Sequence, residues 1–170
     1  LAANYNAVLS CTGATDANPA DGLTITAADN GATIVCTYTN TRRSATLTLV
    51  KTWSNARIGE TATVVSFGFT NNATTGLTTS TGNNTITSPA VTVFAGELGT
   101  IGEGVSNGAN YSSLLACTGT SGLTGTDGQV GGTLLVGAAD TAITCTITNT
   151  RRSATLTLRK TWVNALNGET

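Results

Sequence analysis

The chain has 170 residues, of which only 10% are charged, and its formal net charge is −1. There is no basic surface to neutralise phosphates, and the absence of histidine excludes Ser-His-Asp and Cys-His catalytic sets. No apolar run approaches the roughly 20 residues that a membrane-spanning helix needs. We therefore expect neither a nucleic acid partner nor a transmembrane segment in these residues.

One stretch of the sequence occurs twice. CTYTNTRRSATLTLVKTWSNARIGET, residues 36–61, returns as CTITNTRRSATLTLRKTWVNALNGET, residues 145–170. The offset of 109 residues, from Arg42 to Arg151, is too long for one turn of a solenoid and suits a small domain. The predicted organisation is the C-terminal part of a repeat (1–43), one complete β-sandwich repeat (44–152) and the first strand of the next repeat (153–170).

Short segments of alternating polarity fill the complete repeat, and clusters of Gly, Asn and Asp separate them. The predicted strands are, in chain order, 45–53, 62–70, 90–94, 100–103, 110–117, 132–136 and 141–150, with weaker candidates at 76–80 and 84–88. Seven or more short strands in about 109 residues predict an all-β, two-sheet sandwich of immunoglobulin-like type, repeated in tandem.

The four cysteines form one pair in each copy of the repeat. Cys11 and Cys36 of the first copy match Cys117 and Cys145 of the second. The matched pairs predict two disulfides, Cys11–Cys36 and Cys117–Cys145, and therefore an oxidising compartment. The alternative is four free thiols in a cytosolic protein. No cysteine lies two to four residues from another, so we expect no zinc site, and no other metal or cofactor.

Alternation also places three polar residues on strand faces that should be buried. Lys51 shares a face with the leucines of its strand. Glu103 shares a face with Ile101, and Asn149 shares one with Ile147. Burying such groups is costly unless they meet one another.

These three residue types together carry a specific chemistry. Burial disfavours the charged form of Lys51, which lowers its pKa and makes the amine a nucleophile. The carboxamide of Asn149 is an electrophile, and a protonated Glu103 can polarise it and transfer protons as ammonia leaves. The set predicts a spontaneous intramolecular isopeptide bond.

The segments TLTLVKTW, AGELGTIGEG and CTITNT resemble the prealbumin-like SpaA and Cna B-type repeat domains of bacterial surface proteins and pilins. The resemblance covers about residues 44–151 and both partial repeats. It implies a prealbumin-like sandwich in which Lys51 bonds to Asn149, with Glu103 as the autocatalytic acid. In the flanking repeats it implies Asn40 as the asparagine and Lys160 as the lysine, with partners outside these residues.

Two alternatives to this site remain open at the level of sequence. Glu97 is close enough to Glu103 along the chain to be the acid instead. The site can also be a buried Lys51–Glu103 ion pair, with Asn149 hydrogen-bonded beside it and no covalent bond.

We expect the chain to be a structural repeat of an extracellular or cell-surface bacterial fibre, pilus-like filament or adhesin, and not an enzyme. Its partners would be neighbouring repeats of the same chain, or other copies that complete the partial repeats by strand exchange. The alternatives are a module that binds a sugar, a host surface or ice through its threonine rows, and a spacer domain of an extracellular enzyme.

Overall fold

The computed structural model describes residues 2–164 and 166–168, so the predicted boundaries at Leu1 and Thr170 lie outside the described residues. The structure is nearly all β. Its strands are β1 (Tyr5–Thr12), β2 (Val35–Arg42), β3 (Ser44–Ser54), β4 (Thr61–Phe67), β5 (Thr78–Thr79), β6 (Thr85–Thr87), β7 (Val91–Phe94), β8 (Leu98–Val105), β9 (Tyr111–Thr118), β10 (Leu123–Thr124), β11 (Gly132–Leu135) and β12 (Ala142–Arg151). Its 3₁₀ turns are η1 (Ala2–Asn4), η2 (Pro19–Asp21), η3 (Ala27–Asp29) and η4 (Gly108–Asn110).

Strands β3 to β12 form a sandwich of two sheets. One sheet has the order β10-β11-β8-β4-β5, and the other has the order β6-β3-β12-β9, with β7 also paired to β3. The pairing of β3 with β12 is parallel, and the other pairs within the two sheets are antiparallel. The predicted all-β, two-sheet sandwich is therefore confirmed.

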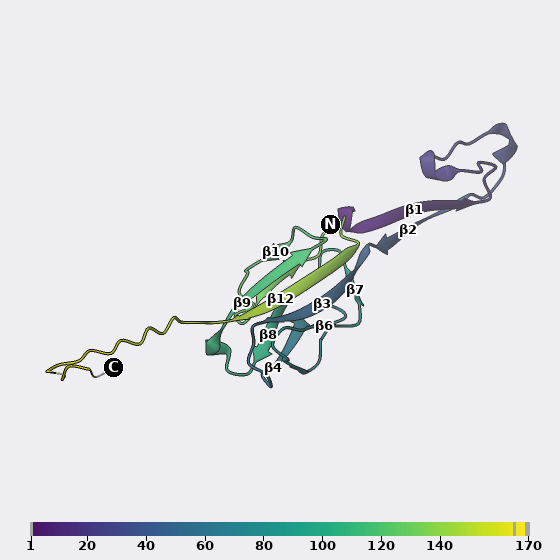
Figure 1. Cartoon of the computed structure of the whole chain (residues 1–170). Coiled ribbons are helices and arrows are strands. Elements are labelled where there is room, and N and C mark those ends of the chain that lie inside the picture. Colours follow the sequence, from purple (N-terminus) through teal and green to yellow (C-terminus); the bar gives the residue numbers. More distant parts are fainter. Residues whose placement is uncertain (1, 165, 169–170) are drawn as a thin grey trace.

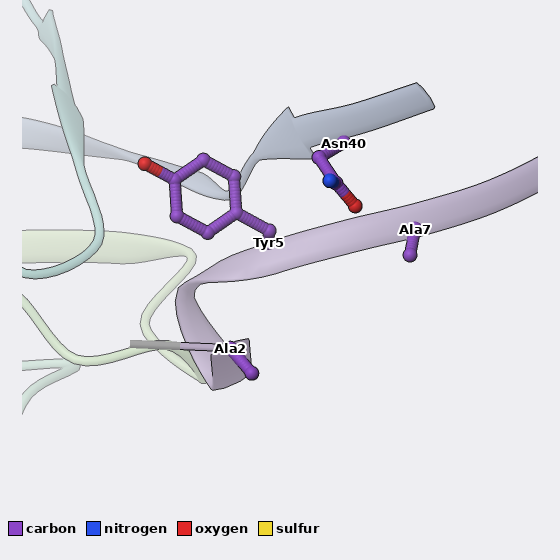
Figure 2. A pocket seen from close by; sticks show the side chains of 4 residues that line it. All are labelled: Ala2, Tyr5, Ala7 and Asn40. Atoms are coloured by element: carbon purple, nitrogen blue, oxygen red, sulfur yellow. The ribbon is translucent and has the colours of Figure 1, made fainter. Parts of the chain in front are cut away.

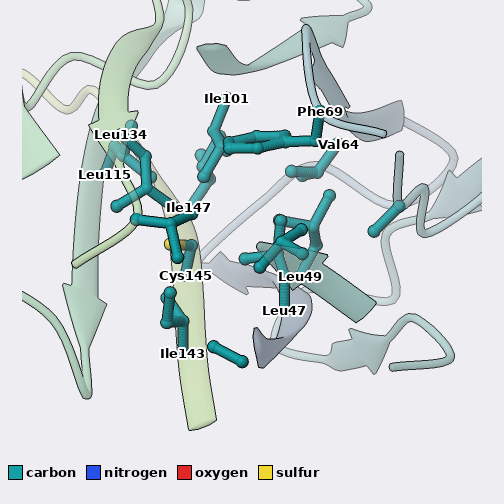
Figure 3. Packing of buried hydrophobic residues seen from close by; sticks show 14 residues of the cluster. Leu47, Leu49, Val64, Phe69, Ile101, Leu115, Leu134, Ile143, Cys145 and Ile147 are labelled. Carbon is teal, nitrogen blue, oxygen red and sulfur yellow. The ribbon is translucent and has the colours of Figure 1, made fainter. Parts of the chain in front are cut away.

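The core lies between the two sheets because alternate residues of each strand point inward. In β3 every second residue is buried, from Ala45 to Trp53. The inward side chains interlock across the sheets, as Figure 3 shows for Leu47, Leu49, Val64, Phe69, Ile101, Leu115, Leu134, Ile143, Cys145 and Ile147. Burial of one such aliphatic side chain contributes about 1.5–3 kcal/mol.

Most predicted strands are present with ends shifted by one or two residues, and two predictions need correction. The predicted strand 62–70 ends at Phe67, because Gly68 has a φ of +87° and turns the chain away. The predicted strand 100–103 is longer, from Leu98 to Val105, since pairing on both sides outweighs its three glycines. The short strand β10 was not predicted.

Two parts of the chain lie outside the sandwich, at opposite ends (Figure 1). At one end, β1 and β2 form a separate antiparallel hairpin. At the other end, residues 153–163 are extended, exposed and in no described strand. In the described residues, no helix has the length and apolar character that crossing a bilayer requires.

The separate hairpin repeats the register of the antiparallel pair β9 and β12 of the sandwich. Tyr5 pairs with Arg42, and Cys11 with Cys36. In the β9–β12 pair, the matching partners are Tyr111 with Arg151 and Cys117 with Cys145. The sequence repeat therefore extends to strand register.

Candidate functional site

The two sheets bring Lys51, Asn149 and Glu103 together in the interior. Lys51 lies on β3 and Asn149 on the adjacent strand β12, two residues beyond Ile147, the partner of Lys51 in the parallel register. Glu103 lies on β8 of the opposite sheet. The two reacting candidates are thus neighbours within one sheet, and the carboxyl faces them across the core.

The lysine and the glutamate are in direct contact. Nζ of Lys51 lies 3.4 Å from Oε2 of Glu103, and both side chains are fully buried. The ammonium also donates to the carbonyl of Thr52 at 2.9 Å and to that of Ile147 at 3.4 Å. These carbonyls hold Nζ between β3 and β12, on the side where Asn149 lies.

The carboxyl of Glu103 is oriented by one hydrogen bond and leaves one oxygen free. Ser113 donates from its hydroxyl to Oε1 of Glu103 at 2.8 Å. Oε2, which faces Lys51, accepts no hydrogen bond among the described residues. This oxygen is therefore available for proton exchange with the amine.

Asn149 is fully buried, and its amide has no hydrogen-bond partner on either Oδ1 or Nδ2 in the described part of the chain. A buried, unpartnered carboxamide is unfavourable by about 1–3 kcal/mol for each polar group. Native structures contain few such groups, and each requires an explanation. Here the atoms that lack partners are those that an isopeptide bond would replace or hydrogen-bond.

Aromatic rings cover the site. Nζ of Lys51 lies 4.4 Å from the centre of the Trp53 ring, and Trp53 meets Tyr111 edge to face at 5.4 Å. The hydroxyl of Tyr111 accepts a hydrogen bond from the backbone N–H of Arg57 at 3.1 Å, which fixes its ring. This cover keeps water away from the amine.

Burial is the main influence on Lys51. It lowers the pKa of Lys51 from 10.5 to about 8, although the negative charge of Glu103 acts in the opposite direction. At neutral pH a larger share of this amine is therefore uncharged than in an exposed lysine.

Glu97, the alternative acid, lies in a different place. Its Oε2 accepts from the backbone N–H of Phe94 at 3.0 Å, and its Oε1 accepts from Thr70 and lies 3.7 Å from Nη1 of Arg42. It lies in the loop after β7, and its contacts are with the end of β7, the loop after β4 and the last residue of β2. Glu103 is the carboxylate that contacts Lys51.

The flanking counterparts are exposed and far from such a site. Asn40 lies on β2 opposite Ala7, and it lines an open pocket of about 300 Å³ with Ala2, Tyr5 and Ala7 (Figure 2). The face of this hairpin that matches the buried face of β9 and β12 is uncovered: Tyr38, at the position of Ile147, is 70% exposed. Lys160 lies in the extended segment, with Nζ 3.7 Å from the centre of the Trp162 ring.

Both predicted disulfides are present. Cys11–Cys36 joins β1 to β2, and Cys117–Cys145 joins β9 to β12. Each links two directly opposed residues of an antiparallel strand pair, with Cα atoms 4.1 Å apart. Among the described residues, no three His, Cys, Asp or Glu side chains gather as a metal site would require.

Sequence analysis missed Ser113, which orients Glu103, and Tyr111 as part of the aromatic cover. Ser113 lies on the inward face of β9 between two buried residues, Tyr111 and Leu115. A polar residue at such a position was the available signal. Which inward-facing side chain it meets depends on the second sheet, which strand alternation does not specify.

No protein-family model matches the chain, and no curated protein matches it in sequence. One similar solved structure is a bacterial adhesin from Mobiluncus mulieris containing intramolecular disulfide, isopeptide and ester bond cross-links. The TM-score is 0.40 at 16% sequence identity, over 68% of this chain and 44% of that one. The chain spans less than half the length of that adhesin, and at so low a TM-score the likeness assigns neither a family nor a function.

Proposed function

We propose that this chain is a structural segment of an extracellular bacterial fibre or adhesin, whose sandwich is locked by disulfides and by a self-formed bond between Lys51 and Asn149. It turns over no substrate. The observation that supports this best is the buried contact of Lys51 with Glu103 beside the unpartnered amide of Asn149. Two disulfides in a chain of 170 residues favour an oxidising compartment outside the cytosol.

The bond forms in one balanced exchange. A proton passes from Nζ of Lys51 to Glu103, and the neutral amine attacks Cγ of Asn149. The carboxyl of Glu103 polarises the Cγ–Oδ1 bond and delivers its proton to Nδ2, and its carboxylate then takes up the second proton that Nζ loses as the amide forms. The new Nζ–Cγ bond replaces the Cγ–Nδ2 bond, and ammonia leaves. No oxidant or cofactor is consumed.

The cross-link suits a load-bearing role because of where it lies. The parallel strands β3 and β12 are the first and last of the sandwich, so tension applied at Ser44 and Arg151 shears the whole ladder between them at once. A bond between Lys51 and Asn149 carries that tension covalently. By analogy with a disulfide that closes a loop of similar length, it would also stabilise the sandwich by about 4–5 kcal/mol.

The deciding experiment is the intact mass of the purified, fully reduced chain. The expected mass is lower than that of the sequence by one ammonia, and proteolysis should release a branched peptide that joins Lys51 to Asn149. A mass equal to that of the sequence would rule out the bond and leave a buried ion pair.

A further inference from the structure

The junction between the N-terminal hairpin and the sandwich is held by hydrogen bonds that lie outside the Lys51–Asn149 site. One residue, Arg43, separates β2 from β3. Its backbone N–H donates to the carbonyl of Asn4, at the end of η1 just before the hairpin, at 2.8 Å, and its carbonyl accepts from the backbone N–H of Ala95 in the sandwich at 2.9 Å. The linker is therefore hydrogen-bonded to both sides.

Arg42 reaches across the same junction. Its Nε donates to the carbonyl of Ala95 at 3.0 Å, and its guanidinium lies 5.6 Å from the centre of the Phe94 ring. Nη1 lies 3.7 Å from Oε1 of Glu97. An exposed ion pair alone is weak, but here a hydrogen bond, a ring contact and an ion pair fix one side chain in three directions.

The loop that receives Arg42 is shaped for it. Glu97 accepts from the backbone N–H of Phe94, which closes residues 94–97 into a tight turn. Gly96 has a φ of +81°, which strains any other residue, and a Cβ there would lie 2.5 Å from the Asn4 side chain, which would have to move. Burial by itself raises the pKa of Glu97, but hydrogen bonds from Thr70 and Phe94, and the charge of Arg42, leave that pKa below its ordinary value. Glu97 is thus ionised and in place at neutral pH.

The second junction has the same sequence, and the described residues beyond it form no folded repeat. Arg152 donates from its backbone N–H to the carbonyl of Asn110 at 2.9 Å, as Arg43 does to Asn4. Arg151, the counterpart of Arg42, is exposed, whereas Arg42 is half-buried. Residues 153–163 follow it without a described strand.

We propose that the first arginine of each ArgArg pair is a clamp that fixes the angle between consecutive repeats, and that its receptor is the Phe94–Glu97 loop of the following copy. Arg42 shows the clamp engaged, and Arg151 presents it to the matching loop of a further repeat. The fibre is then a rod with a set angle at each junction. The idea of a further repeat rests on the proposed function, whereas the engaged clamp is independent of the isopeptide bond.

The test is the orientation of the hairpin relative to the sandwich in the whole chain, from residual dipolar couplings and backbone ¹⁵N relaxation. In the unmodified chain, amides of β1 and β2 and amides of β3 to β12 should share one alignment tensor and one tumbling time. Arg42→Ala should give the hairpin a separate, weaker alignment and faster apparent tumbling. Arg42→Lys, which loses the Nε hydrogen bond, should give an intermediate result.

Arg151→Ala is the matched control. It removes the counterpart of Arg42 from the second copy of the motif, after which the described residues form no folded repeat. It should leave the hairpin's alignment unchanged. A hairpin that tumbles independently in the unmodified chain, or an Arg42→Ala chain that keeps a single tensor, overturns the clamp. The mass measurement on the same samples reports the cross-link separately.

Discussion

Nζ of Lys51 lies 3.4 Å from Oε2 of Glu103 although the two residues come from opposite sheets of the sandwich. A buried pair of this kind is close to neutral for stability when it stays ionic, because desolvation offsets the attraction. We propose that it serves instead as a proton-transfer pair beside Asn149. The first two predictions separate these two roles.

Loss of either the nucleophile or the acid should prevent the loss of ammonia. Lys51→Ala and Glu103→Gln should each show the full sequence mass after reduction. Lys160→Ala is the control, since Lys160 lies in the same LTLxKTW motif but is exposed and outside the sandwich. It should retain the ammonia deficit. A deficit that survives in Glu103→Gln would remove Glu103 from the chemistry.

Removing Asn149, the residue that the amine of Lys51 would attack, should make the stability of the chain depend on pH. In Asn149→Ala the amine of Lys51 stays free, with a pKa of about 8 when folded against 10.5 when unfolded. Between these values the unfolded chain binds more protons, so the free energy of unfolding should rise with pH across this window, by roughly 3 kcal/mol.

Denaturant unfolding at a series of pH values measures this effect. The unmodified chain, whose amine would be an amide, should lack the rise, and so should Asn149→Ala combined with Lys51→Met. A rise of the same size in the unmodified chain would show that Lys51 is free there.

The two disulfides should act on separate parts of the chain. Replacing Cys117 and Cys145 by serine should lower the stability of the sandwich by about 3 kcal/mol, because the bond closes a loop within it. The matched change at Cys11 and Cys36 should leave the sandwich's Tm unaltered, since that hairpin lies outside it. Thermal unfolding monitored by the near-ultraviolet signal of Trp53 distinguishes them; equal losses would contradict two separate units.

In single-molecule pulling on the ends of the chain, the cross-link should reduce the extension that is released when the sandwich unfolds. With Lys51 bonded to Asn149, the residues between them stay out of the load path and the sandwich gives no full unfolding step. Lys51→Ala under non-reducing conditions should restore a step on the order of 200 Å, at about 3.3–3.6 Å per extended residue. A step of that size in the unmodified chain would contradict a covalent load path.

Much of this protein is determined locally. The period of two along its strands sets which residues face inward, and this placed Lys51, Asn149 and Glu103 in the core from the sequence alone. The repeated cysteines predicted both disulfides, because each copy of the repeat carries one pair at matching positions. These features depend on neighbours along the chain, which the sequence contains.

Other features depend on which strands meet, and only the tertiary structure decided them. Nearness along the chain left Glu97 open as an alternative to Glu103, and the pairing of β8 with β4 and β11 placed Glu103 against Lys51. The same holds for Ser113 on Glu103, and for Arg42 on the loop before Glu97. A strand's pattern fixes the direction of its side chains, whereas their partners follow from long-range packing of the two sheets.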